Sequence, residues 1–143
     1  MIEVELFGAE RSPADEDVPP SSRGAGIPPV EEVRRLCVLA AGSAGVRDGH
    51  LAIEFVDERR ISQLNGEFRD KPTPTDVLSF PVDGLEPSGG ARELGDVMIC
   101  IEHTADVREA IVHGVLHLLG MDHESDNGEM LALQDELLER ADR

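Results

Sequence analysis

The sequence predicts an α+β fold, in which a small mixed β-sheet packs with helices in a single domain spanning residues 1–143. Three patterns support this prediction. Hydrophobic and charged residues alternate at the start of the chain, as in a half-buried strand, and later segments repeat hydrophobic residues every three or four positions, as in amphipathic helices. Residues 107–119 are apolar over most of a helical circumference, so this helix is expected to be buried at the centre.

The N-terminal part of the chain is predicted to contain a strand, a loop and a helix. Residues 2–6 alternate Ile, Val and Leu with glutamate, which predicts a strand with one buried face. Residues 8–27 are acidic and rich in Pro, Ser and Gly, which predicts a flexible loop with no catalytic role. Pro28 and Pro29 then open a helix that ends at Gly42. Its apolar face is expected to consist of Val30, Val33, Leu36, Cys37 and Ala40.

The middle of the chain is predicted to contain three strands and one helix. The strands are residues 51–56, 77–80 and 97–101. Asp57 is a typical N-cap for the helix after the first of these strands, and that helix is expected to run through Phe68. Its buried stripe is Ile61, Leu64 and Phe68. A loop rich in proline and glycine at residues 83–93 precedes the third strand.

Two capping signals predict the remaining helices. Asp106 with Glu109 forms a capping box for the central helix, and Asp126 with Glu129 forms one for the last helix. The buried stripe of the last helix is expected to be Leu133, Leu137 and Leu138. No internal repeat is visible in the sequence, so these elements are expected to form one domain.

Three histidines, His113, His117 and His123, stand close together at the end of the central helix. Residues four apart share a helix face, so the first two can direct ring nitrogens to a common point. Gly120 permits the left-handed conformation that ends a helix, so the chain can turn back and bring His123 to that point. Three imidazoles with a fourth position for water are typical of catalytic zinc. The motif predicts an open site for one divalent metal ion, zinc first and nickel or another ion as alternatives.

The competing interpretation is that these histidines are unrelated side chains in a core or on a surface. Three of the five histidines of the chain fall within eleven largely apolar positions, which makes unrelated placement a poor explanation. Burial of imidazoles without polar partners would also be unfavourable. We therefore favour the metal ligands.

The same spacing matches the metzincin proteases, with Gly120 at the eighth position of their motif. The glutamate that follows the first histidine in those enzymes is replaced here by Gly114. Because that glutamate is their general base, the pattern keeps the metal ligands and loses the peptide-hydrolysing group.

Further segments precede the histidines and extend the comparison. They are Leu64–Arg69, with sequence LNGEFR, Pro74–Pro81, with sequence PTDVLSFP, and Leu94–Cys100, with sequence LGDVMIC. Together with the histidine segment, the chain resembles the YbeY-type endoribonucleases of ribosomal RNA processing. The resemblance implies a metal-dependent hydrolase that cuts single-stranded RNA in 16S rRNA 3′-end maturation and ribosome quality control. It implies zinc on the three histidines and a role in activity for Arg69.

Phosphoryl-transfer chemistry supports roles for these residues. A metal ion polarises a phosphoryl oxygen and lowers the pKa of its water. An arginine fork such as that of Arg69 suits the charge that develops on the phosphate, although without the resemblance a solvated side chain is equally reasonable.

Four carboxylates near the motifs are further candidates. Asp76 or Asp96 could orient a metal-bound histidine; for Asp76, in a Thr-Pro-Thr-Asp stretch, we favour the capping of a turn. Asp122 or Glu124 could carry a proton beside His123, although an exposed position is the simpler interpretation. The sequence identifies no general base.

Composition restricts the partners of the chain. Thirteen basic residues face 30 acidic ones, a net charge of -17, so the surface as a whole should repel RNA. The expected exception is a local patch of Arg59, Arg60, Arg69 and Lys71 around the metal. Presentation of the RNA on the ribosome, or by a ribosomal or GTPase protein partner, would resolve the conflict.

The sequence contains no apolar stretch long enough to span a membrane and no export leader, so we expect a cytoplasmic protein. Cys37 and Cys100 are expected to be separate buried thiols. Two alternatives to the nuclease stay open. One is a metallohydrolase of peptides or small molecules, and the other is a ribosome assembly factor whose metal stabilises its fold.

Overall fold

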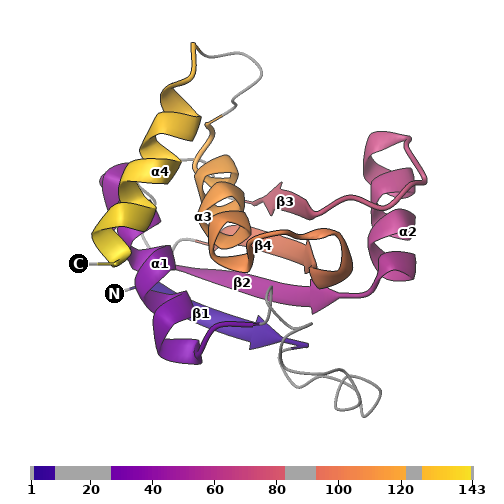
Figure 1. Ribbon diagram of the computed structural model, residues 1–143, viewed down its shortest axis with the longest axis horizontal. Helices are drawn as coiled ribbons and strands as arrows, with labels where there is room; N and C mark the ends of the chain where they lie inside the picture. Colours follow the sequence, from indigo (N-terminus) through magenta and orange to yellow (C-terminus); the bar gives the residue numbers. More distant parts are fainter. Residues whose placement is uncertain (1, 9–26, 83–92, 122–126, 143) are drawn as a thin grey trace.

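The computed structural model describes residues 2–8, 27–82, 93–121 and 127–142. Over these residues the chain forms a four-stranded mixed sheet with four α-helices, which confirms the predicted α+β class (Figure 1). The strands are β1 (Ile2–Phe7), β2 (Gly49–Val56), β3 (Val77–Pro81) and β4 (Glu93–Cys100). The helices are α1 (Val30–Ser43), α2 (Glu58–Arg69), α3 (Val107–Leu118) and α4 (Glu129–Ala141), with a 3₁₀ turn, η3, at Ile101–His103.

The strand order across the sheet is β1-β2-β4-β3. Strands β1, β2 and β4 are parallel, whereas β3 is antiparallel to β4 and forms one edge of the sheet. The parallel pair β1 and β2 is joined through α1, as parallel pairs require a crossover connection.

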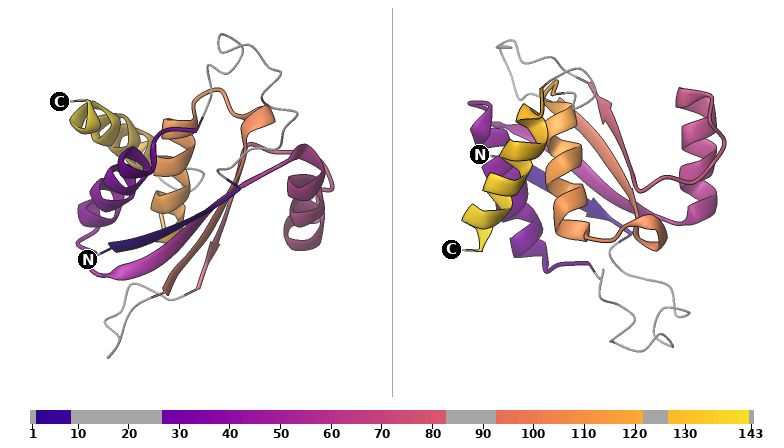
Figure 2. Two further views of the ribbon diagram at one scale, coloured as in Figure 1. Left: turned by 90° about the horizontal axis from the view of Figure 1, so that it is seen from below. Right: turned by 45° about the horizontal axis from the view of Figure 1, so that its top comes forward.

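The two faces of the sheet are covered differently. Helices α1, α3 and α4 lie over one face, and α2 lies over the other (Figure 2). Because side chains alternate along a strand, Val97 and Ile99 of β4 join the larger core under α3, whereas Met98 and Cys100 join the smaller core with α2. Helix α3 contacts α1, α4, β3 and β4, so the predicted central helix is confirmed.

Several elements differ in detail from the prediction. Val30 is the first residue of α1 and is exposed, so the buried face begins at Val33. Phe68 lies in the last turn of α2 with 63% of its surface exposed, and it makes an edge-to-face contact with Phe80 instead of entering the core. Strand β4 ends at Cys100 because the 3₁₀ turn follows immediately.

Helix α4 begins differently from the predicted capping box. Glu129 is its first residue and Gly128, with φ of 99°, is its N-cap, so Glu129 cannot be the third residue of a box. Asp126 lies outside the described residues. Leu133 and Leu138 are only partly buried, because spacing of four and three residues along α4 places a different set against α3. The buried residues are Met130, Gln134 and Leu137.

Other expectations are settled in part. The predicted loops fall mostly on residues 9–26 and 83–92, which lie outside the described residues, and Glu93 belongs to β4. Cys37 and Cys100 are free and buried, as predicted, and burial raises the pKa of the Cys37 thiol to about 12. Within the described ranges, no helix combines the length and apolar character needed to cross a membrane.

Candidate metal site

Helix α3 carries the first two predicted ligands into the centre of the fold. The Asp106 carboxylate accepts a hydrogen bond of 3.2 Å from the backbone N–H of Glu109, so the N-cap half of the predicted capping box is present. The reciprocal half is not formed, because the Glu109 carboxylate accepts no hydrogen bond from a described residue. At the other end, Gly120 adopts φ of 93°, and the N–H of Met121 returns to the carbonyl of Leu116 at 3.1 Å. The left-handed termination predicted at Gly120 is therefore confirmed.

His113 and His117 are half-buried and lie one helical turn apart on the same face of α3. Their Nε2 atoms are 3.1 Å apart, and the ring planes are inclined by 73°. Two nitrogens at about 2.0–2.1 Å from one tetrahedral zinc ion are separated by about 3.3–3.4 Å. The two imidazoles therefore fit a shared divalent metal ion with little adjustment.

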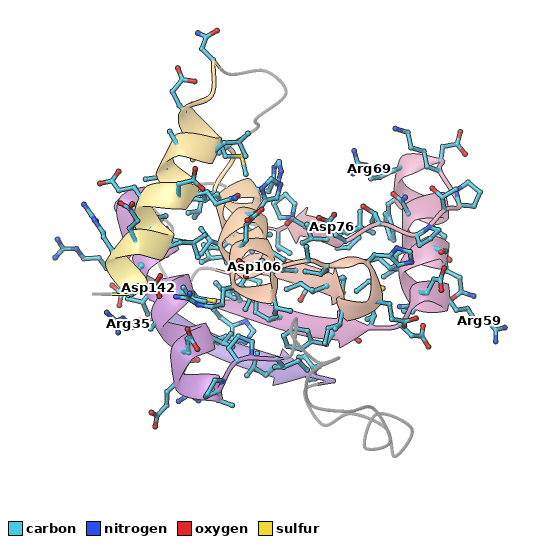
Figure 3. All side chains as sticks on the ribbon, viewed as in Figure 1. Arg35, Arg59, Arg69, Asp76, Asp106 and Asp142 are labelled. Atoms are coloured by element: carbon cyan, nitrogen blue, oxygen red, sulfur yellow. The ribbon has the colours of Figure 1, made fainter. Side chains whose placement is uncertain are left out.

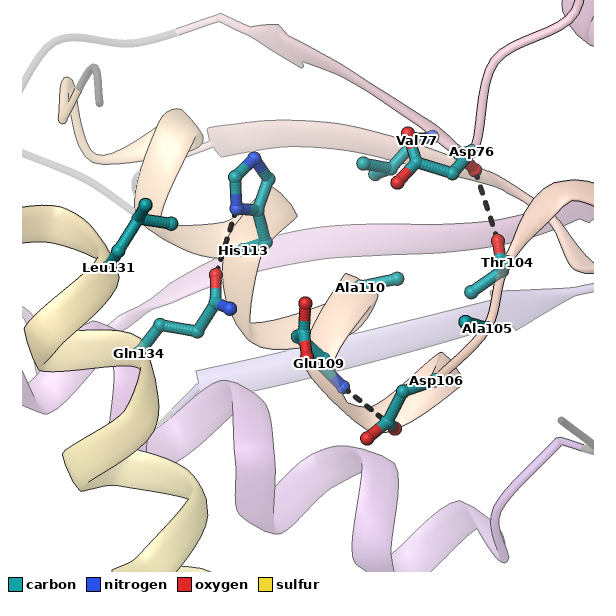
Figure 4. A pocket seen from close by; sticks show the side chains of 10 residues that line it. All are labelled: Asp76, Val77, Thr104, Ala105, Asp106, Glu109, Ala110, His113, Leu131 and Gln134. Atoms are coloured by element: carbon teal, nitrogen blue, oxygen red, sulfur yellow. Dashed lines mark hydrogen bonds between the residues drawn. The ribbon is translucent and has the colours of Figure 1, made fainter. Parts of the chain in front are cut away.

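Gln134 of α4 orients the ring of His113 and selects its tautomer. Its Oε1 accepts a hydrogen bond of 2.8 Å from His113 Nδ1, and the glutamine is only 4% exposed (Figure 4). An amide oxygen is only an acceptor, so Nδ1 carries the ring proton and Nε2 keeps its lone pair toward His117. This is the usual arrangement around a metal-ligating histidine. Sequence analysis missed Gln134; the signal was a polar residue between Met130 and Leu137 on the apolar face of α4.

Gly114 brings α3 close to the sheet. A Cβ atom at this position would lie 2.4 Å from Val97 Cγ1 and 3.3 Å from Ser79 Oγ. The Ser79 hydroxyl also donates a hydrogen bond of 2.9 Å to the Gly114 carbonyl. The protease glutamate therefore has no room between His113 and the sheet, which gives a structural reason for its absence.

The two acidic candidates among the described residues occupy different places. The Asp76 carboxylate accepts hydrogen bonds from the N–H of Val77 at 2.8 Å and from the Thr75 hydroxyl at 3.3 Å, which matches the favoured turn-capping role. Asp96 lies two residues before Met98, on the sheet face covered by α2. Because His113 lies over the opposite face, orientation of a metal-bound histidine by Asp96 does not fit the structure.

The remaining candidates are placed only in part. His123, Asp122 and Glu124 lie outside the described residues. Among the residues that the structure places, no group of three or more metal-binding side chains gathers, so the third ligand stays a prediction.

The expected basic patch is divided between the two ends of α2. Arg69 is the exposed last residue of the helix and makes no hydrogen bond or ion pair with a described residue (Figure 3). Arg59 lies ten positions earlier, which corresponds to about 15 Å along a helix axis. Of the four predicted residues, only Lys71 lies near Arg69, whereas Arg59 and Arg60 lie at the other end of α2. The prediction that all four form one patch is therefore wrong.

Comparison with known proteins shows the family of the chain. A sequence profile described as Endoribonuclease YbeY matches residues 30–142. The chain belongs to the YbeY endoribonuclease family. The resemblance predicted from the sequence is thereby confirmed, and the matched range includes all four of the segments that supported it.

Individual YbeY proteins are similar over most of the chain. Endoribonuclease YbeY of Macrococcus caseolyticus is 37% identical over 126 residues, covering 75% of this chain and 82% of the relative. Endoribonuclease YbeY of Nautilia profundicola is also 37% identical, over 105 residues, covering 65% of this chain and 73% of the relative. That of Mycolicibacterium paratuberculosis is 41% identical over 110 residues, covering 62% of each chain.

A solved structure shares the architecture. The solution structure of TM1509 from Thermotoga maritima covers 99% of this chain and 89% of its own length, with a TM-score of 0.52 and 23% identity. This likeness supports the fold alone. The identity of the metal and the roles of individual residues in this YbeY-family chain stay predictions.

Proposed function

We propose that this chain is a zinc-dependent endoribonuclease that cleaves single-stranded ribosomal RNA, in 16S rRNA 3′-end maturation and ribosome quality control. His113, His117 and His123 would hold the metal, and Arg69 would bind the phosphate. The observation that carries the proposal is the pair of Nε2 atoms 3.1 Å apart, with one imidazole oriented by a buried amide. Membership of the YbeY endoribonuclease family supports the reaction and the substrate.

In this proposal, different side chains bind the metal, orient its ligand and bind the phosphate. A bound divalent ion would supply Lewis acidity toward a phosphoryl oxygen and toward water. Gln134 holds the Nδ1 proton of His113, so that Nε2 is available as a ligand. The Arg69 guanidinium would neutralise the negative charge of the phosphate through paired N–H donors. Gly114 supplies no carboxylate, so the proton acceptor comes from another position or from the substrate.

The net charge favours presentation of the RNA by a larger assembly. With 30 acidic against 13 basic residues, long-range attraction of free RNA is weak. We propose that the ribosome, or a ribosomal or GTPase protein, presents the substrate. Since ribosomes are cytoplasmic, this substrate would place the activity in the cytoplasm.

The test is cleavage of a labelled single-stranded fragment from the 3′ end of 16S rRNA, with metal content measured on every sample. The parent is compared with His117→Ala, Arg69→Ala and a chelator-treated sample. Arg59→Ala is the matched control, because Arg59 is the same residue type on the same helix at its opposite end. We expect cleavage by the parent and by Arg59→Ala, and its loss from the other three, with metal retained in Arg69→Ala.

Other outcomes would redirect the assignment. Equal cleavage by His117→Ala would contradict the metal-dependent mechanism. Loss of folded structure, followed by circular dichroism, on chelation of an inactive parent would favour the assembly factor with a structural metal. Equal loss of cleavage in Arg59→Ala and Arg69→Ala would mean that Arg69 acts only through its positive charge and not through a specific contact with the phosphate.

A further inference from the structure

A cavity of about 190 Å³ lies beside His113, between α3, α4 and the start of β3 (Figure 4). Its lining residues are Asp76, Val77, Thr104, Ala105, Asp106, Glu109, Ala110, His113, Leu131 and Gln134. Pockets for drug-sized ligands occupy about 300–1,000 Å³, so this cavity suits one planar ring system instead of a larger molecule. The combination of apolar walls and a few polar groups is typical of a small-molecule site.

Two of the three lining carboxylates are already engaged. Asp106 accepts the backbone N–H of Glu109, and Asp76 accepts the backbone N–H of Val77. The Glu109 carboxylate, one turn before His113 on the same helix face, accepts no hydrogen bond from a described residue. It is therefore the lining carboxylate whose two oxygens are both free of hydrogen bonds from described residues, and thus the best-placed acceptor for a ligand.

Gln134 supplies a donor from the opposite helix. Its Oε1 is bound to His113 Nδ1, and the residue is 4% exposed. Its Nε2 has no hydrogen-bond partner among the described residues. Figure 4 shows this amide nitrogen directed into the space that Glu109 also lines. Gln134 Nε2 is not among the fully buried polar atoms that lack a partner, so its N–H is open to the cavity, where water or a ligand can accept its hydrogen bond.

The charge of the cavity selects the part of an RNA that can enter. Among the residues that the structure describes, three carboxylates and no lysine or arginine line it, so a phosphate is repelled. A base that carries an amino group can donate to a carboxylate, and a ring nitrogen next to that amino group can accept from an amide. Cytosine and adenine present this donor–acceptor pair. Uracil presents a carbonyl oxygen and an N–H at the corresponding atoms of its ring, which reverses the pattern.

We propose that this cavity binds a cytosine or adenine base of the RNA substrate, with Glu109 accepting from the exocyclic amino group and Gln134 Nε2 donating to the adjacent ring nitrogen. The proposal rests on the proposed ribonuclease function, because the substrate is RNA. The bound base lies beside His113, so the pocket selects the nucleotide next to the phosphate that is cleaved.

Nucleoside binding tests the pocket without any cleavage. The ¹⁵N-labelled protein is titrated with cytidine or uridine, a matched pair that differs at the amino group and the adjacent ring nitrogen. The reporter is the Gln134 side-chain amide signal, assigned by its disappearance in Gln134→Glu. We expect saturable shifts with cytidine and none with uridine. Glu109→Ala should weaken cytidine binding about tenfold or more, within the range for a base-specific contact.

The matched control is Glu139→Ala, which removes the same charge from an exposed position of α4 away from the cavity. It should bind cytidine as the parent does. Equal shifts with cytidine and uridine, or unchanged cytidine binding by Glu109→Ala, would overturn the pocket. Metal-dependent cleavage of RNA without cytidine binding would refute the pocket and keep the nuclease. Cytidine binding without any cleavage would keep the pocket and refute the nuclease.

Discussion

Gly114 of α3 and Val97 of β4 are in such close contact that a Cβ atom on the glycine would lie 2.4 Å from Val97 Cγ1. The contact sets the distance between α3 and the sheet. It lies on the segment of α3 that carries the two histidines. His113 and His117 precede and follow this point on the helix. The glycine that removes the protease glutamate thus also determines where the predicted metal ligands lie.

Gly114→Ala should destabilise the protein. Replacing a glycine inside a helix with alanine usually stabilises the folded protein by about 0.5–1 kcal/mol. Here the added methyl group meets Val97 in a packed core, and such overpacking costs about 1–3 kcal/mol. The free energy of unfolding, measured in urea by circular dichroism, should therefore fall.

Gly42→Ala is the control for this prediction, because Gly42 is also helical and a Cβ atom there meets nothing within 4 Å. Gly42→Ala should raise the free energy of unfolding by up to about 1 kcal/mol. Stabilisation by both substitutions would show that α3 does not lie against Val97 as closely as described.

Much of the site could be predicted because its signals are local. The i and i+4 spacing of His113 and His117, the N-cap at Asp106 and the left-handed Gly120 each depend on a few neighbouring residues. Gln134 could not be found in this way. Its bond to His113 joins residues 21 apart and depends on how α4 packs against α3.

The other errors also concern relationships across the fold. Asp96 was a reasonable partner for a histidine until the alternation of β4 placed it on the opposite sheet face. Phe68 has the correct helical spacing for burial, yet it lies in the exposed last turn of α2. Periodicity indicates which residues share a face, whereas tertiary packing decides how much of that face is covered.

Gln134→Leu should weaken metal binding by about 10–100-fold, the usual cost of removing the partner of a ligating histidine. Leucine keeps the bulk of the buried side chain and removes the acceptor for His113 Nδ1–H. A competition titration with a chromophoric chelator and zinc measures the affinity. Gln134→Glu keeps an acceptor for His113 Nδ1–H and should retain most of the zinc affinity.

Gln63→Leu is the control for the loss of the amide, since Gln63 is exposed on α2. Its zinc affinity should equal that of the parent. An unchanged affinity in Gln134→Leu would mean that the hydrogen bond does not support a metal ligand.

Asp57→Ala should cost about 0.5–2 kcal/mol of stability. The Asp57 carboxylate accepts a hydrogen bond of 2.8 Å from the N–H of Arg60 at the start of α2, and alanine leaves that donor without its cap. Urea unfolding measures the change. Asp135→Ala, on the exposed surface of α4, should change the stability by no more than about 0.5 kcal/mol. Equal effects would indicate that the cap contributes nothing beyond the loss of a charge.

His50 links three parallel strands and should make stability depend on pH. Its Nε2 is 2.7 Å from a Glu5 oxygen and its Nδ1 is 2.6 Å from a Glu93 oxygen, so both ring nitrogens can donate when the imidazole is charged. The hydrogen bond to Glu5 raises the pKa of His50 most; partial burial opposes the rise, and Glu93 adds to it. The charged form is therefore favoured in the folded state.

A pKa raised by folding stabilises the protein below the unfolded value, about 6.5, and this stabilisation is lost as the pH rises through the folded value. The difference in unfolding free energy between the parent and His50→Gln should therefore be largest between about pH 5 and 6.5, where the glutamates are still ionised, and should shrink at higher pH. Urea unfolding of both proteins from pH 5 to 9 measures it. Glu5→Gln should flatten the profile, because it removes the hydrogen bond that raises the pKa of His50 most. A difference that grows with pH would mean that the neutral imidazole is the form held between the strands.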